Sequence, residues 1–189
     1  MRKSDKVKER IMEAAIALIT ESSGDVTDIN TRAIAERAGV GIGLINYHFQ
    51  TKEHLIERCV ERIIGDVISA FHPSFPPTVQ TPIERLKHST KLVGDFLMSN
   101  PAMSRISILS DFKNPRQTDN TMKSAMEVKA VAGDLEISEK GKEILAFSLI
   151  SAMQALFLRK GLLGYNMNNK EQRDELLDML IDTLFRGLA

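Results

Sequence analysis

The sequence has little of several features that define common classes of protein. Its 189 residues contain a single cysteine, Cys59, which excludes an internal disulfide and fits a reducing compartment such as the cytoplasm. No apolar run approaches the roughly 20 residues that a membrane-spanning helix needs. Alternation of Val, Ile and Thr with polar residues is nearly absent, so we expect no strand. The sequence therefore predicts an all-α, cytoplasmic protein without a membrane partner.

The charges of the chain balance overall but not locally. Lys and Arg number 25, as do Asp and Glu, which argues against a protein that coats nucleic acid by bulk electrostatics. Residues 1–10 nevertheless carry five basic and two acidic side chains, whereas residues 11–30 carry four acidic ones and no Lys or Arg. The basic start leads into an amphipathic helix, so we do not expect a signal peptide. It suits local contact with phosphates, although a solubilising helix start has the same composition.

Apolar residues recur at helical spacing along most of the chain, interrupted by loops and by a proline-rich linker at residues 72–80. Caps such as Thr51 and the Thr-Pro pair at 81–82 mark helix starts. The pattern predicts about nine helices, over residues 5–21, 31–38, 41–49, 51–71, 81–99, 101–112, 120–132, 139–164 and 169–187.

Three glycines stand at every second position in residues 39–43, and two interpretations compete for them. A dinucleotide-binding loop would need its third glycine at position 44, which is Leu44, and a strand before the first. The Gly-Lys-Ser/Thr ending of a phosphate loop is also missing, so we expect no nucleotide cofactor. A tight turn between two short helices fits instead, with Gly39 in a left-handed conformation.

Gly41 and Gly43 are less easily explained, because glycine at a helix start costs about 0.5–1 kcal/mol relative to alanine. Two explanations stay open. The missing side chains would let the helix backbone approach another surface closely, or glycine is merely tolerated there. In either case the stretch predicts a helix-turn-helix.

The stretch TRAIAERAGVGIGLINYHFQTKEHLI resembles the TetR family of bacterial transcriptional repressors. The resemblance covers about residues 7–60, and the chain departs from it at Gly41 and at residues 44–46. It implies a three-helix DNA-binding domain at residues 1–52 and a C-terminal effector-binding and dimerisation domain at 53–189. The residues that carry it are Thr31, Ile34-Ala35, Ala38-Gly39-Val40, Tyr47-His48-Phe49 and Lys52-Glu53-x-Leu55.

In such a motif the second helix lies in the major groove. Ile45 and Phe49, four residues apart, are expected to face the core. Outward neighbours then include Leu44, suited to a thymine methyl group, and Asn46, suited to adenine. The resemblance adds Arg32 as a guanine contact and Tyr47 and His48 as phosphate contacts; solvation or surface pairing is the alternative for each. The predicted DNA-contacting set is Thr31, Arg32, Gly41, Ile42, Gly43, Leu44, Asn46, Tyr47, His48 and Lys52.

The last two helices are too apolar for the surface of a small bundle, which favours burial in a homodimer; burial within one chain is the alternative. The predicted dimer contacts are Leu156, Leu163, Leu177, Leu180 and Leu184. Methionines among polar residues in the helices before them suit an adaptable apolar cavity, although core packing gives the same pattern. The candidate effector residues are His88, Asp95, Met122, Met126, Ser151 and Gln154.

These patterns together predict a DNA-binding regulator that is released from a palindromic or near-palindromic duplex operator by a small apolar or amphipathic effector. We do not expect an enzyme, a cofactor or a metal site, because no convergent catalytic set is visible and the four histidines lack ligand spacing. The alternatives are a helical adaptor that has lost DNA binding and an activator of the same fold.

Overall fold

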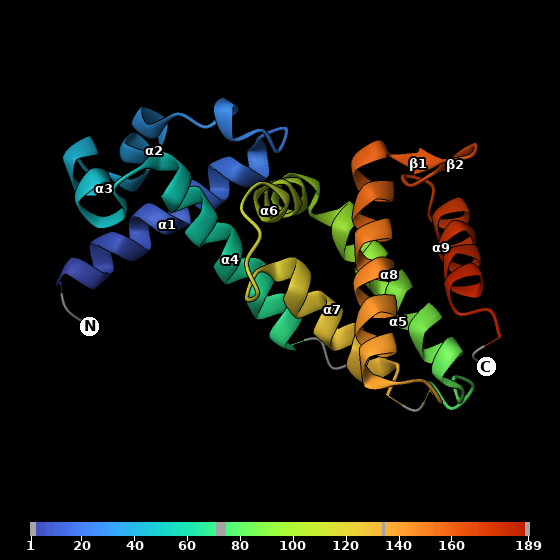
Figure 1. Cartoon of the computed structure of the whole chain (residues 1–189). Helices are drawn as coiled ribbons and strands as arrows, with labels where there is room; N and C mark the ends of the chain where they lie inside the picture. The colour runs from blue at the N-terminus through green and yellow to red at the C-terminus, as the bar shows by residue number, and fades with distance from the viewer. Residues whose placement is uncertain (1–2, 71–74, 134, 188–189) are drawn as a thin grey trace. The chain divides into compact units, whose positions relative to one another are not determined.

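The computed structural model describes residues 3–70, 75–133 and 135–187. Arg2 and residues 72–74 of the predicted linker lie outside this part. Within it, the fold is all-α apart from one short hairpin, as predicted (Figure 1). Its elements are α1 (Lys3–Glu21), the 3-10 helix η1 (Val26–Asp28), α2 (Thr31–Ala38), α3 (Ile42–Phe49), α4 (Lys52–Ala70), α5 (Pro82–Ser99), α6 (Pro101–Lys113), α7 (Asn120–Val131), α8 (Glu139–Arg159), β1 (Gly161–Leu162), β2 (Tyr165–Asn166) and α9 (Lys170–Leu184).

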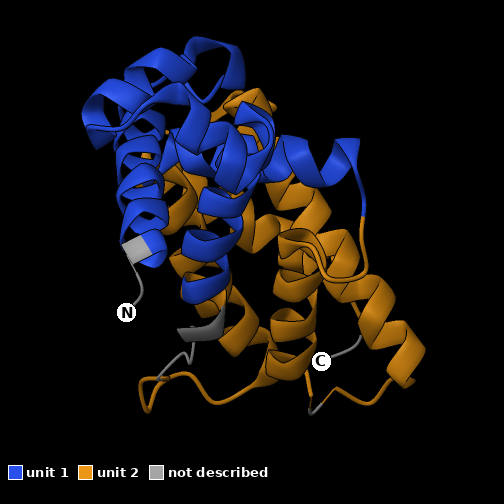
Figure 2. Cartoon of the chain, turned by 90° about the vertical axis from the view of Figure 1, so that its left-hand side faces the viewer, with its two compact units in different colours: residues 1–66, 100–115 blue, residues 67–99, 116–189 orange. Residues whose placement is uncertain are grey.

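The chain forms two compact units (Figure 2). Unit 1 contains residues Met1–Asp66 and Asn100–Pro115, and unit 2 contains Val67–Ser99 and Arg116–Ala189. Helix α6 therefore packs with the N-terminal helices, although α5 separates it from them in sequence. The division at residues 52 and 53 that the family resemblance implies is a division by function, and it stays a prediction.

Unit 1 is built around aliphatic side chains from its helices. Ile11 and Ile19 of α1 and Leu55 and Ile56 of α4 are fully buried. Burial of each such side chain contributes about 1.5–3 kcal/mol. Cys59 is buried with them, and burial raises the pKa of its thiol to about 12, so the thiol stays protonated and unreactive.

Unit 2 has its own apolar core, formed by α5, α7, α8 and α9. An ion-pair ladder between α5 and α9 lies beside this core. Lys87 pairs with Asp182 at 2.6 Å and Lys91 with Asp178 at 2.7 Å. The core side chains include Leu86, Ala125, Leu149, Met153, Leu177 and Ile181.

Asp95 extends the ladder between α5 and α9. It accepts hydrogen bonds from Lys170 at 2.8 Å and from Arg173, and Arg173 also donates to the Met167 carbonyl at 3.0 Å. Burial raises the pKa of Asp95, but the hydrogen bonds and charges of Lys170 and Arg173 outweigh it and hold the pKa below its ordinary value. Asp95 is therefore ionised near neutral pH and neutralises a buried guanidinium.

The hairpin corrects the prediction of a helix through residue 164 and of a chain without strands. Helix α8 ends at Arg159 because Lys160 adopts a left-handed conformation at φ 62°. Strands β1 and β2 then pair antiparallel around Leu163 and Gly164, whose φ angles of 53° and 86° suit a two-residue turn with both residues left-handed. The apolar run continues across this turn, so its composition resembles a longer helix.

Helix α8 also corrects the statement that no apolar run approaches a membrane span. Its 21 residues are long and apolar enough to cross a membrane, judged by length and composition alone. Seven of its side chains, from Ala146 to Phe157, are buried. The core helix of a globular unit is buried in this way, and it has the same apolar composition as a membrane-spanning helix.

We expect Gly161→Ala to destabilise the protein more than Gly164→Ala. An added Cβ at Gly161 would lie 1.9 Å from the Tyr165 carbonyl oxygen, at a φ of 139°, whereas a Cβ at Gly164 would meet nothing within 4 Å. Strain alone costs about 1–2 kcal/mol at Gly164, and about 1–3 kcal/mol plus the clash at Gly161. Thermal unfolding followed by circular dichroism measures both, and equal losses would contradict the described hairpin.

Candidate nucleic-acid interface

Helices α2 and α3 form the helix-turn-helix that the sequence predicts. The side chain of Asn30 accepts a hydrogen bond from the Arg32 amide at 2.8 Å, so the cap of α2 is Asn30 and not Thr31. The helix ends at Gly39, which adopts the left-handed conformation at φ 62°. Gly41 then precedes the first residue of α3. The turn is therefore short and specified by its own sequence.

Two basic residues of α1 contact the helix-turn-helix, one at the turn and one at the end of α3. Arg10 donates hydrogen bonds to the carbonyls of Ala38 and Gly39, the latter at 3.1 Å. A cation at the C-terminal end of α2 is also favoured by the helix dipole. Lys8 lies 5.8 Å from the ring centroid of Phe49 in a cation–π contact. The basic start of the chain thus supports the motif directly, which the charge pattern alone did not indicate.

Helix α3 has a buried and an exposed side. Ile45 is fully buried and Phe49 is 3% exposed, which confirms that they face the core. Leu44 is 41% exposed and Tyr47 is 78% exposed, as expected for outward side chains. Ile42, which belongs to the predicted DNA-contacting set, is also 41% exposed because it stands in the first turn of the helix.

The remaining outward residues of α3 differ in their surroundings. Asn46 is exposed, whereas His48 is half-buried and packs edge-on against the Tyr47 ring at 5.1 Å between centroids. A Cβ built on Gly41 or on Gly43 would meet nothing within 4 Å. Packing within the protein therefore does not require glycine at either position.

Lys52 and Thr31, two further predicted DNA contacts, have different surroundings. Lys52 donates from Nζ to the Val26 carbonyl at 3.0 Å and lies 3.8 Å from a Glu53 carboxylate oxygen. These internal partners stabilise a cation in the first turn of α4, and the contact of Lys52 with DNA stays a prediction. Thr31 is half-buried at the start of α2, and Arg32 beside it is exposed.

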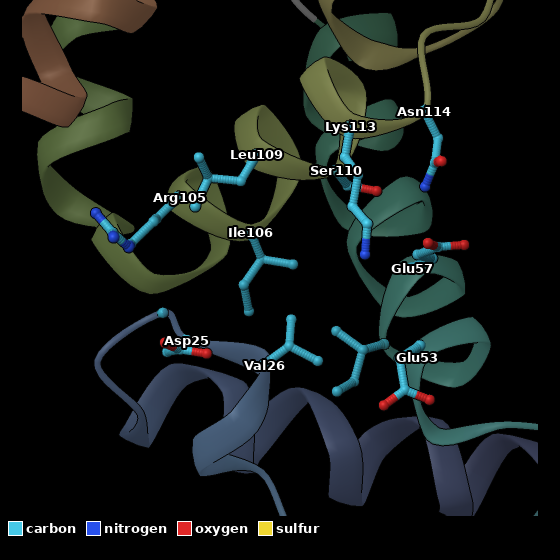
Figure 3. Close-up of a pocket in the computed structure, with 12 residues that line it drawn as sticks. Asp25, Val26, Glu53, Glu57, Arg105, Ile106, Leu109, Ser110, Lys113 and Asn114 are labelled. Atoms are coloured by element: carbon cyan, nitrogen blue, oxygen red, sulfur yellow. The ribbon is translucent and has the colours of Figure 1, made fainter.

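A pocket of about 220 Å³ lies among η1, α4 and α6 within unit 1 (Figure 3). Its apolar lining includes Ile106 of α6, which points toward Val26 of η1 (Figure 3). No local pattern in the sequence predicts this pocket, because its walls come from segments about 80 residues apart. Its charged and polar lining consists of Asp25, Glu53, Glu57, Arg105, Ser110, Lys113 and Asn114.

The candidate effector residues of unit 2 occupy varied positions. Asp95 belongs to the ion-pair ladder, and Met126 is 65% exposed. His88 is half-buried with its ring 6.0 Å from that of Phe75. Gln154 is buried and donates to Thr121 Oγ1 at 2.9 Å. Met122 and Ser151 are half-buried, and the Ser151 hydroxyl oxygen has no hydrogen-bond partner.

The candidate dimer residues are mostly part of the protomer's own core. Leu156 and Leu177 are buried there, and Leu180 and Leu184 pack against the same core. Leu163 is 84% exposed at the tip of the hairpin. The exposed apolar side chains of the last two helices are others, namely Ile144 and Phe147 of α8 and Met179 of α9.

Comparison with known proteins finds similarity to one family of regulatory proteins. The sequence model of the bacterial regulatory proteins of the tetR family matches residues 11–59, which run from α1 into α4. Residues 11–59 therefore have the sequence pattern of the tetR family. Over 120 residues it is 27% identical to the HTH-type transcriptional repressor KstR of Rhodococcus jostii (strain RHA1), covering 61% of this chain and 54% of that protein. The chain thus spans about half the length of this curated relative.

Solved structures of TetR-family proteins share the fold over almost the whole chain. A TetR transcriptional regulator from Rhodococcus sp. RHA1 matches with a TM-score of 0.67 at 19% identity, covering 100% of both chains. A TetR-family regulator from Streptomyces coelicolor matches with a TM-score of 0.64 at 19% identity, covering 97% of this chain and 80% of that one. The two-part helical fold of the chain is therefore the fold of these solved structures.

We expect Asp95→Asn to destabilise the protein much more than Lys170→Ala. The Arg173 side chain is only 5% exposed, and it would lose its carboxylate partner. Because Asp95 is 40% exposed, we expect about 2 kcal/mol, less than the roughly 3–5 kcal/mol of a fully buried pair. Lys170 is 61% exposed, and its loss should cost about 0.5 kcal/mol. Urea unfolding distinguishes them; equal stabilities would favour an effector role for Asp95.

Proposed function

We propose that the protein is a DNA-binding transcriptional repressor that holds a palindromic or near-palindromic duplex operator with the α3 helices of two copies. The exposed side of α3 carries this proposal. Leu44, Asn46 and Tyr47 project from it, and Gly41 and Gly43 leave its leading end bare. Packing within the protein does not explain these exposed apolar side chains and weak helix formers. Contact with the surface of a binding partner would explain them. The match of residues 11–59 to the tetR family model and the similarity to a repressor support the same function.

Phosphate contacts surround α3 in this proposal. Thr31 lies at the positive N-terminal end of α2, where backbone amides favour an anion. Arg32 is exposed beside it and reaches a guanine or a phosphate. Lys52 retains ammonium protons beyond the one donated to Val26. Operator affinity should therefore fall steeply as salt rises, since each phosphate contact releases counterions.

The homodimer in this proposal uses the outer faces of α8 and α9. Ile144 is 60% exposed and Phe147 is 45% exposed on α8, and Met179 of α9 is 40% exposed. Leu156 and Leu177 already fill the core of the protomer, so they support the interface from beneath. A two-fold dimer would place two α3 helices about 34 Å apart, one turn of B-DNA, or slightly more.

Release by a small apolar or amphipathic effector would act through α6. Helix α5 of unit 2 continues through Asn100 directly into α6 of unit 1. Within unit 1, α6 lies against the loop before η1, where a Cβ on Gly24 would come within 2.9 Å of the Ala102 Cα. An effector that binds more tightly when α5 is displaced would therefore shift α6 and the elements it contacts. Only such a difference in affinity moves the equilibrium.

Selection of duplexes from a random pool, followed by mobility shift, tests DNA binding. We expect Asn46→Ala and Arg32→Ala each to weaken the selected complex by about 5- to 150-fold, the effect of about 1–3 kcal/mol per base contact. Arg37→Ala is the matched control, because Arg37 stands on the same helix but pairs with Glu21 at 2.9 Å. Failure to select any duplex would favour the adaptor alternative. Reporter assays would separate a repressor from an activator.

The dimer face gives a separate prediction. We expect Phe147→Glu to yield monomers in sedimentation experiments and to abolish two-half-site binding, because a buried charge would lie in the interface. Leu163→Asn tests the predicted contact at the hairpin tip separately, since asparagine tolerates the left-handed φ of 53° there. If Leu163→Asn dissociates the dimer and Phe147→Glu does not, the hairpin is the interface instead.

A further inference from the structure

The outward side of α3 has an unusual chemical composition for a helix that would lie in a DNA groove. Residues 42–49 contain no Lys, Arg, Asp or Glu, and Asn46 is the one residue among them with a side-chain amide. Guanine is normally bound by Arg or Lys, and cytosine by Asp or Glu. Helix α3 therefore lacks the charged groups that would select a G·C pair.

Apolar side chains of α3 are exposed next to Gly43, where no side chain covers the helix backbone. Leu44 and Tyr47, three residues apart, are neighbours on the helix surface, at 41% and 78% exposure. Gly43 lies one turn before Tyr47 on the same side, and the space where its Cβ would stand is open for 4 Å. Ile42, 41% exposed, precedes Gly43. Gly43, Leu44 and Tyr47 together form an exposed apolar surface with uncovered backbone at Gly43.

The major groove offers one apolar group that matches this surface. Of the four bases only thymine presents a methyl group there, whereas the other base edges present hydrogen-bond donors and acceptors. A polar edge packed against Leu44 or against the face of the Tyr47 ring would lose its water without gaining a partner, which is unfavourable. Asn46, beside them, can bond adenine through its amide. The available contacts thus favour A·T pairs.

We infer that α3 recognises an A·T-rich half-site through thymine methyl groups, which pack against Gly43, Leu44 and Tyr47. This inference rests on the proposed function as a duplex-binding protein. Guanine contacts, where present, come from Arg32 of α2 at the edge of the half-site. Gly43 is a specificity residue here, since its missing side chain leaves room for the methyl group beside the helix backbone.

Replacement of thymine by deoxyuridine tests this inference directly, because it removes the methyl group and keeps every hydrogen bond. The duplex is first selected from a random pool with the full-length protein. Each thymine of the half-site is then replaced in turn and the affinity is measured. We expect about a fourfold loss for each contacted methyl, equivalent to about 0.8 kcal/mol for one buried carbon.

Two variants show which residues meet the methyl group. Leu44→Ala should bind the thymine and uridine duplexes nearly equally, whereas Arg37→Ala should keep the wild-type preference for thymine. Gly43→Ala should raise the melting temperature, because alanine is the better helix former, and weaken operator binding about tenfold or more. Circular dichroism of each variant confirms that the fold is intact.

The outcomes separate the two proposals. A selected half-site rich in A·T pairs, with uridine sensitivity that Leu44→Ala removes, supports the inference. A selected duplex that is bound specifically but is insensitive to uridine at every position overturns the inference and leaves DNA binding in place. If no duplex is selected, the proposed function fails, and the inference fails with it.

Discussion

The burial of Ile45 and Phe49 beneath α3 is the constraint on which the candidate interface depends. Helices α2 and α3 have eight residues each, which is too short for a stable isolated helix in water. Their stability must come from packing, and these two fully or almost fully buried side chains supply it. Once they fix the rotation of α3, the orientation of every other side chain on the helix follows from the 3.6-residue period. Arg10 and Lys8 reinforce the same arrangement from α1.

Helix α6 belongs to unit 1, so the chain passes from unit 2 to unit 1 between α5 and α6. Because α5 and α6 are joined through a single residue, Asn100, a shift of one helix constrains the start of the other. The pocket beside Ile106 and Val26 means that α6 has space next to it in unit 1. Coupling between distant sites requires an element with two arrangements, each preferred by a different ligand. In the proposed function, α6 is that element.

The helices could be predicted almost entirely from the sequence, because apolar periodicity and strong caps such as Thr51 act locally. Thr51 Oγ1 indeed accepts from the His54 amide at 3.1 Å. What the sequence left open or missed involves partners distant in sequence or ambiguous composition. Periodicity shows that Leu156 and Leu177 are buried but not which chain buries them. The internal partner of Lys52 and the walls of the pocket come from segments that no spacing rule connects. The hairpin was missed because Leu162 and Leu163 continue the apolar run of α8.

Helix α3 departs from the rules for a stable helix in several ways, and the departures lie on one surface. Gly41 and Gly43 lower helix stability where the protein leaves room for alanine. Leu44 and Tyr47 expose apolar area that a solvated helix would replace with charged residues. Each feature alone is tolerable in a stable protein. Natural sequences are otherwise consistent from local propensity to packing, so departures that coincide in space indicate a site kept for function rather than for stability. A surface of bare backbone and apolar side chains gains free energy only against a partner that presents apolar groups of its own at close range.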